Sequence, residues 1–113
     1  MDLDQARCRA IATWLDTAPE ADWITEAWLF GSRAKGEARP DSDVDLAFTL
    51  RDEPGRTAEG EAICGRRRWN AALTALLGLR ADTWWLNDPE SEIVAPAVAD
   101  HGVLLWSREG KTA

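Results

Sequence analysis

Helix-like and strand-like patterns alternate along the chain of 113 residues, and this alternation limits the folds that it can adopt. Over residues 4–17 the apolar side chains recur at helical spacing, and Asp2 or Asp4 is placed to cap the first turn. The short apolar run Ile24–Phe30 stops at Gly31, as a buried strand does before a turn. The sequence therefore begins with a helix followed by a strand.

The alternation continues through the middle of the chain. A short helical stretch at 32–36 and a loop at 37–41 precede a second predicted strand, Val44–Leu50. A turn cluster at 51–56 is followed by a long helix that ends at Gly78. The inner face of this helix is predicted to carry Ala62, Trp69, Leu73, Leu76 and Leu77.

The last part of the chain gives two further strands and one helix. Residues 80–86 form the third predicted strand, in which Trp84 and Trp85 point to opposite sides. A last helix is expected from Pro89 through Asp100, kinked near Pro96, with Gly102 ending it before the apolar run 103–106. The order αβαβαβαβ predicts an α/β (α+β) fold in which helices cover a sheet, and residues 1–113 are expected to form one domain.

Composition and charge exclude several classes of protein. A chain that is 45% hydrophobic can bury a core, so wholesale disorder is excluded. A net charge of -7 repels nucleic acid and anionic membranes, so an anionic substrate needs a local device such as a metal ion. The acidic N-terminus and the lack of a long apolar run predict a soluble, cytoplasmic protein. Cys8 and Cys64 form neither a disulfide framework nor a zinc site, and both are expected to be small, buried or inert.

The segment between the first two strands carries the residues that indicate chemistry. Gly31 lacks a Cβ, so a phosphate can approach its backbone, and Ser32 offers a hydroxyl at the start of a short helix. Asp43 and Asp45 stand two apart at the head of a strand and therefore point to one face, where a cation such as Mg²⁺ offsets their repulsion. If the third strand lies beside the second, Asp82 joins them as a third metal ligand and a proton acceptor.

These residues resemble the polymerase-beta-type nucleotidyltransferases, and most of all the minimal nucleotidyltransferase (MNT) group. That group's pattern is Gly-Ser-x-Ala-Arg-Gly, a loop, then Ser-Asp-x-Asp-Leu. The corresponding residues here are Gly31, Ser32, Arg33, Ala34, Lys35 and Gly36, then Ser42, Asp43, Val44, Asp45 and Leu46. Lys35 stands where Arg is usual, so the positive charge is kept but the planar fork is not.

The resemblance implies a fold, an activity and a partner. It implies a small mixed sheet and a transfer of AMP from ATP to a hydroxyl, with two Mg²⁺ ions held by Asp43, Asp45 and Asp82. It also implies that Asp82 activates the acceptor and that the nucleotide is bound by Gly31, Ser32, Arg33 and Lys35. Members of the group resemble antitoxins that add AMP to a tyrosine of a HEPN ribonuclease toxin. This chain has no Tyr, so it cannot modify itself on Tyr, which fits an acceptor in another protein. The acidic net charge predicts no direct binding of nucleic acid.

Other interpretations of the same residues remain open. The chain can be an antitoxin that neutralises the toxin by binding alone, or an adenylyltransferase for a small molecule. Asp43 and Asp45 can be a solvated strand entry, and Asp82 can be a polar residue at an exposed strand end beside Arg80. The run 66–68 of three arginines is typical of a solvated face. His101, at a helix end, is expected to be structural.

Overall fold

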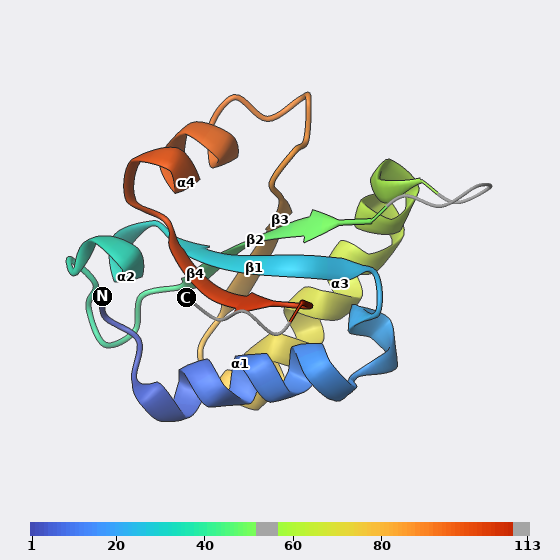
Figure 1. The fold of residues 1–113 in the computed structure, drawn as a ribbon. Coiled ribbons are helices and arrows are strands. Elements are labelled where there is room, and N and C mark those ends of the chain that lie inside the picture. The colour runs from blue at the N-terminus through green and yellow to red at the C-terminus, as the bar shows by residue number, and fades with distance from the viewer. Residues whose placement is uncertain (52–56, 110–113) are drawn as a thin grey trace.

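The computed structural model describes residues 1–51 and 57–109, and within them the predicted order of helices and strands is confirmed (Figure 1). The predicted turn cluster at 51–56 lies outside the described residues except for Arg51. The structure adds a short 3₁₀ helix, Pro19–Ala21, between the first helix and the first strand. The elements are α1 (Gln5–Thr17), β1 (Ile24–Phe30), α2 (Ser32–Lys35), β2 (Val44–Leu50), α3 (Ala58–Leu77), β3 (Ala81–Trp85), α4 (Val94–His101) and β4 (Val103–Ser107).

The described strands form one mixed sheet in the order β3-β2-β1-β4. β1 pairs antiparallel with β2 and with β4, whereas β2 and β3 run parallel. Figure 1 shows α1 and α3 on one face of this sheet and α4 on the other. The crossover from β2 to β3 is made by α3, as a parallel pair requires a long connection. The predicted mixed sheet covered by helices is therefore confirmed.

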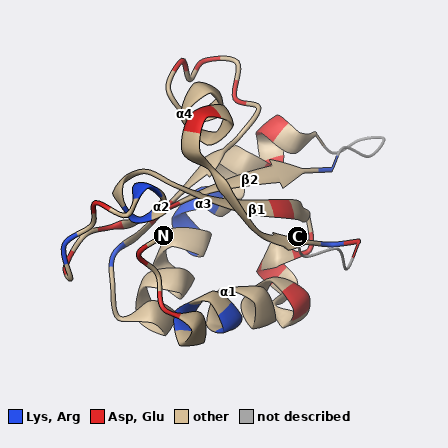
Figure 2. Ribbon diagram, turned by 60° about the vertical axis from the view of Figure 1, so that its left-hand side comes forward, with Lys and Arg blue, Asp and Glu red and all other residues tan. Residues whose placement is uncertain are grey.

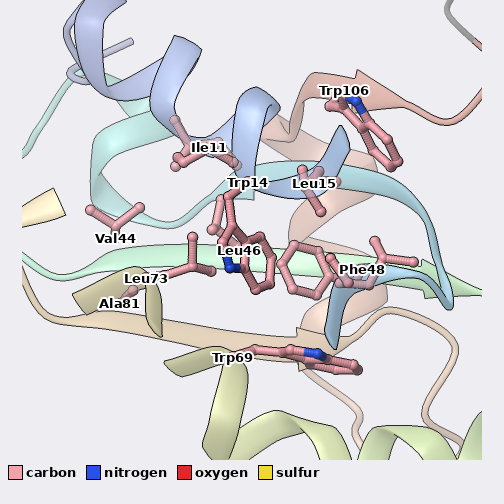
Figure 3. Close-up of a cluster of buried hydrophobic side chains, with 14 of the residues drawn as sticks. Ile11, Trp14, Leu15, Val44, Leu46, Phe48, Trp69, Leu73, Ala81 and Trp106 are labelled. Atoms are coloured by element: carbon pink, nitrogen blue, oxygen red, sulfur yellow. The ribbon is translucent and has the colours of Figure 1, made fainter. Parts of the chain in front are cut away.

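The larger core lies between the sheet and the helices α1 and α3. Phe48 of β2 is fully buried there, stacked on Trp14 at 6.4 Å between ring centroids and edge-on to Trp69 at 5.6 Å (Figure 3). Ala47, the next residue along the strand, faces the other side and packs with Phe30 and Val94 under α4. Both faces of β2 are thus covered, which explains why Val44–Leu50 is almost continuously apolar.

The first helix begins as the sequence predicts, and one of the two proposed caps is used. The side chain of Asp4 accepts a hydrogen bond from the backbone N–H of Arg7 at 3.1 Å, so Asp4 is the cap. The carboxylate of Asp2 instead accepts the backbone N–H of Ala38 at 2.9 Å. Asp2 therefore ties the N-terminus to the loop that follows α2.

The last helix is shorter than predicted, and Pro96 does not interrupt it. It begins at Val94 rather than Pro89, because the Asp88 side chain accepts the N–H of Glu90 at 2.9 Å and forms a turn there. Pro96 is the third residue of α4. A proline in the first turn removes an N–H that has no intrahelical partner, so the helix can contain it.

Two residues of α3 differ in exposure from what the sequence predicts. Trp69, Leu73 and Leu77 recur every four residues and form the buried stripe, whereas Leu76 lies at its edge and is 48% exposed. Cys64 points away from this stripe and is exposed, while Cys8 on α1 is partly buried against the core. Trp84 and Trp85 alternate as predicted, yet both are half-buried because β3 is an edge strand.

The position of Phe48 gives a direct test of the core. Phe48→Ala is expected to lower the free energy of unfolding by about 3–5 kcal/mol, because it leaves a cavity between two indole rings. Leu76→Ala serves as the control, since it removes an exposed apolar side chain and is expected to change stability by less than about 0.5 kcal/mol. Chemical denaturation monitored by tryptophan fluorescence measures both, and similar losses in the two variants would contradict this packing.

Candidate active site

The pairing of three strands brings the sequence-predicted residues to one edge of the sheet. β1 ends where the antiparallel β2 begins, and Phe30 lies opposite Asp45. β3 runs parallel to β2, and Asp82 lies opposite Asp45 on the other side. The predicted adjacency of the second and third strands is therefore confirmed. Asp45 lies between the residue that precedes Gly31 and the aspartate of β3.

Gly31 occupies a conformation and a space that require glycine. Its φ of 75° and ψ of -158° lie in a region that residues with a Cβ rarely adopt. A Cβ built on Gly31 would lie 2.5 Å from the Oδ2 atom of Asp45. The backbone turn after β1 therefore lies directly against the Asp45 carboxylate, and any larger side chain at position 31 would displace one or the other.

Asp45 is the most perturbed acid among the described residues. Its pKa is raised from an ordinary value of 3.8 to about 6, first by partial burial and then by the carboxylates of Asp82 and Asp43. The guanidinium of Arg80 opposes these effects without cancelling them. The site therefore carries negative charge that Arg80 neutralises only in part.

Arg80 lies between the two outer carboxylates. Its Nε is 3.6 Å from Asp82 Oδ2 and 3.9 Å from Asp43 Oδ2, and its own side chain is 72% exposed. The side chain of Asp82 is only 19% exposed, so it is largely covered even though it lies beside Arg80. An exposed ion pair contributes less than about 1 kcal/mol to stability, so a divalent cation can displace Arg80 from the carboxylates.

Two side chains of α2, those of Ser32 and Lys35, are not used in internal polar contacts of the described part of the chain. The basic residues of this helix are blue in Figure 2. The side chain of Ser32 is half-buried and that of Lys35 is exposed. Within residues 1–51 and 57–109 neither side chain makes a hydrogen bond. Both are therefore free to contact a ligand beside Gly31.

Arg33 differs from the prediction that it binds the nucleotide. It is 7% exposed, and its guanidinium donates to the backbone carbonyls of Asp2, Arg39, Pro40 and Ser42 at 2.7–3.4 Å. These bonds fix the loop that leads into Asp43. Because the donors are committed to the loop, the geometry gives Arg33 an anchoring role in place of a phosphate contact.

The carboxylates of Asp43, Asp45 and Asp82 suit a hard divalent cation, although as arranged here they are not close enough together to hold one. Carboxylate oxygens are the ligands that Mg²⁺ prefers, and a cation beside Asp45 would stabilise its ionised form against the burial and the repulsion that raise its pKa. Among the described residues no group of three or more acidic, His or Cys side chains is close enough to hold a metal ion. Arg80 lies in the position where the outer carboxylates would otherwise face a cation.

Two contacts near these elements are not predicted by the sequence. The imidazole of His101 accepts the backbone N–H of Gly31 at 2.9 Å, across 70 residues of chain. Arg66 lies over the Trp84 ring at 4.0 Å and bonds the carbonyl of Thr83, so it is not part of a solvated face, whereas Arg67 and Arg68 are exposed. No local pattern marks either contact, because each partner comes from a distant element.

A hollow of about 300 Å³ lies beside Arg66 and Trp84, between α3 and the segment after β3. Its lining also includes Trp85, Ile63 and Asp88. Asp43, Asp45 and Asp82 are not among its lining residues. The hollow is therefore separate from the edge of the sheet where the carboxylates gather.

The model of one protein family matches most of the chain. Residues 15–111 match the family described as Polymerase beta, Nucleotidyltransferase. No curated protein matches the chain.

Solved structures of toxin-antitoxin complexes share the fold. One is a toxin-antitoxin with AMP-PNP, at 24% identity and a TM-score of 0.67, covering 88% of this chain and 73% of that one. Another is a tri-AMPylated Shewanella oneidensis HEPN toxin in complex with MNT antitoxin, at 20% identity and a TM-score of 0.66, with coverage of 95% and 75%. A third is the toxin-antitoxin MntA-HepT, at 21% identity and a TM-score of 0.63, with coverage of 94% and 74%. At such identities these likenesses establish the fold alone.

The raised pKa of Asp45 predicts how stability depends on pH in the absence of metal. A carboxyl whose folded pKa is about 6, against 3.8 when unconstrained, contributes stability that is fully present below about pH 4 and is lost as the pH rises through about 6. Asp45→Asn removes this loss. In EDTA at about pH 7.5 the variant is therefore expected to be more stable than the original protein by about 1 kcal/mol, after allowance for solvent screening.

Thermal unfolding at several pH values measures this difference. Asp41→Asn is the control, because it removes the same charge from an exposed loop position outside the cluster. The gain in Asp45→Asn is expected to shrink as the pH falls through about 6 and to disappear below about pH 3, where the Asp45 carboxyl is protonated in both states. An Asp45→Asn variant that is less stable than the original protein at about pH 7.5 would contradict a raised pKa of Asp45 in the folded protein.

Proposed function

Because the chain belongs to the polymerase beta nucleotidyltransferase family, we propose that it moves AMP from ATP to a hydroxyl group of a partner protein. The observation that carries the proposal is the register of the sheet, in which Asp45 lies beside Asp82 and under the Gly31 turn. A carboxylate cluster next to a turn at Gly31, which has no Cβ, suits a nucleoside triphosphate and its cations. The described residues act here as one minimal nucleotidyltransferase domain.

The proposed roles follow the positions of the side chains. The Gly31 backbone, the Ser32 hydroxyl and the Lys35 ammonium contact the β and γ phosphates. Asp43, Asp45 and Asp82 are the ligands of two Mg²⁺ ions. When bound, these ions supply positive charge against the phosphates and the charge that develops during transfer. Arg80 leaves the carboxylates and remains close enough to face the phosphates.

The transfer itself needs one proton acceptor from the chain. Asp82 takes the proton of the acceptor hydroxyl as its oxygen attacks the α-phosphorus of ATP. The new bond joins the acceptor oxygen to the α-phosphorus. The bond between the α-phosphorus and the bridging oxygen breaks, and pyrophosphate leaves with the electron pair. AMP remains on the acceptor.

The proposed acceptor is a tyrosine of a HEPN-type ribonuclease toxin, which this chain neutralises as its antitoxin. The structural neighbours support this choice, since one of them contains a tri-AMPylated HEPN toxin bound to an MNT antitoxin. The chain itself has no Tyr, so a tyrosine acceptor has to be in another molecule. None of the described helices is long and apolar enough to cross a membrane. A cytoplasmic location and the lack of direct binding to nucleic acid remain predictions from the sequence.

Two observations favour a second candidate function, that of an antitoxin that acts by binding alone. Arg80 already pairs with Asp43 and Asp82, and Lys35 replaces the arginine that is usual in the family motif. Both features would also suit a site that has lost its nucleotide. In that case the chain covers the toxin, and the carboxylates have only a structural role.

Intact mass spectrometry of the partner toxin separates these functions. After incubation with this protein, ATP and Mg²⁺, the toxin is expected to gain one or more AMP groups. Asp43→Ala is expected to abolish the gain, because it removes a metal ligand at the head of β2. Asp41→Ala, which removes a carboxylate two positions earlier in the loop, is the matched control and is expected to retain activity.

Full transfer by Asp43→Ala would contradict the proposed site. An unmodified toxin that still forms a stable complex with the original protein would favour the antitoxin that acts by binding alone. Transfer to a small hydroxyl compound without any toxin would instead support a small-molecule adenylyltransferase.

A further inference from the structure

The side chain of His101 connects the end of α4 to the turn that follows β1. Its Nε2 accepts a hydrogen bond from the backbone N–H of Gly31 at 2.9 Å. Because Nε2 is an acceptor, the ring is neutral and its proton is on Nδ1, which lies 3.1 Å from the Asp100 carboxylate. The His101 side chain is 15% exposed, so protein surrounds most of the ring.

The N–H that His101 accepts is at a point where the chain leaves the sheet. Phe30 is the last residue of β1, and the Gly31 backbone has the positive φ described above. In this conformation the backbone of Gly31 lies so close to the Asp45 carboxylate that a Cβ would clash with its Oδ2 atom. The imidazole therefore holds the turn from one side while the carboxylate limits it from the other.

The position of His101 is fixed by the packing of α4 on the sheet. Val94, Ala97 and Val98 of α4 pack with Phe30 and Ala47 on the outer face. After His101, the N–H of Gly102 closes the helix on the carbonyl of Val98 at 2.8 Å, and β4 begins and pairs with β1. The ring is thus attached to a helix that is held at both ends, and so it can position the Gly31 turn.

We propose that His101 is a positioning residue for nucleotide binding, which holds the Gly31–Ser32 turn over Asp45 so that it can receive the phosphates of ATP. This inference rests on the proposed function and adds a residue that lies outside the Gly-Ser and Asp-x-Asp motifs. His101 itself touches neither nucleotide nor acceptor. It acts through the backbone of Gly31.

The hydrogen bond can be observed directly by nuclear magnetic resonance. In the ¹⁵N-labelled protein, a scalar coupling across the bond is expected between the Gly31 amide nitrogen and Nε2 of His101. The chain has one His, so the ring signals are assigned without ambiguity. Absence of this coupling, with Gly31 and His101 both assigned, would overturn the inference without bearing on catalysis.

Two substitutions separate the acceptor from the bulk of the ring. His101→Phe keeps an aromatic ring but has no acceptor, whereas His101→Gln keeps an acceptor oxygen near the position of Nε2. Calorimetric titration with ATP and Mg²⁺ is expected to show affinity about three- to tenfold weaker in His101→Phe, the effect of losing one hydrogen bond. His101→Gln is expected to recover most of the loss. Faster hydrogen exchange at Gly31 and Ser32 should accompany the weaker binding in His101→Phe.

The outcomes distinguish this inference from the proposed function. Equal affinity for ATP in the original protein and in a folded His101→Phe would overturn the positioning role and leave the transferase proposal standing. Equal weakening in His101→Phe and His101→Gln would also overturn it, because the acceptor would then not be the feature that matters. An original protein that binds no ATP, with the coupling present, would overturn the proposed function and the nucleotide role of His101 together.

Discussion

The register of β2 between its two neighbours is the constraint on which the site depends. Asp45 lies opposite Phe30 of β1 and opposite Asp82 of β3, so the sheet itself places a carboxylate between the Gly31 turn and a second carboxylate. The core secures this register, because Phe48 is held between Trp14 and Trp69 on one face and Ala47 lies under α4 on the other. A slip of one residue would exchange the two faces of the strand and move Asp45 away from Asp82. The fold therefore determines the charge cluster.

Local patterns in the sequence predict most of the fold and the motif residues of the site. The limits of β1 and β2 agree with the structure because short apolar runs ended by Gly31 or by polar residues mark buried strands clearly. The last helix begins later than predicted because a side-chain hydrogen bond of Asp88 stabilises a turn. The adjacency of Asp82 follows from a helical crossover and is therefore accessible to sequence reasoning. These features are determined by residues within one element or by the connection between two successive strands.

The contacts that escape sequence reasoning join distant parts of the chain. Arg33 lies in the motif and carries the charge of a phosphate ligand, but only the folded loop reveals that backbone carbonyls use its donors. His101 and Gly31 are 70 residues apart, and the packing of α4 brings them together. Arg80 is close to Asp82 along the chain, but it also reaches Asp43 because β2 and β3 align their first residues. Together, Arg33 and His101 hold the ends of the segment that carries Gly31 and Asp43, so the geometry of the short motif depends on contacts that its pattern does not reveal.

The central claim is that the carboxylate edge of the sheet is a metal and nucleotide site. A crystal structure of the protein with Mg²⁺ and a non-hydrolysable ATP analogue tests it most directly. We expect ions bound by Asp43, Asp45 and Asp82, phosphates against the turn at Gly31, and Arg80 moved away from the two outer carboxylates. A nucleotide bound elsewhere, for example in the hollow beside Trp84 and Arg66, with Arg80 still paired to Asp43 and Asp82, would contradict the claim.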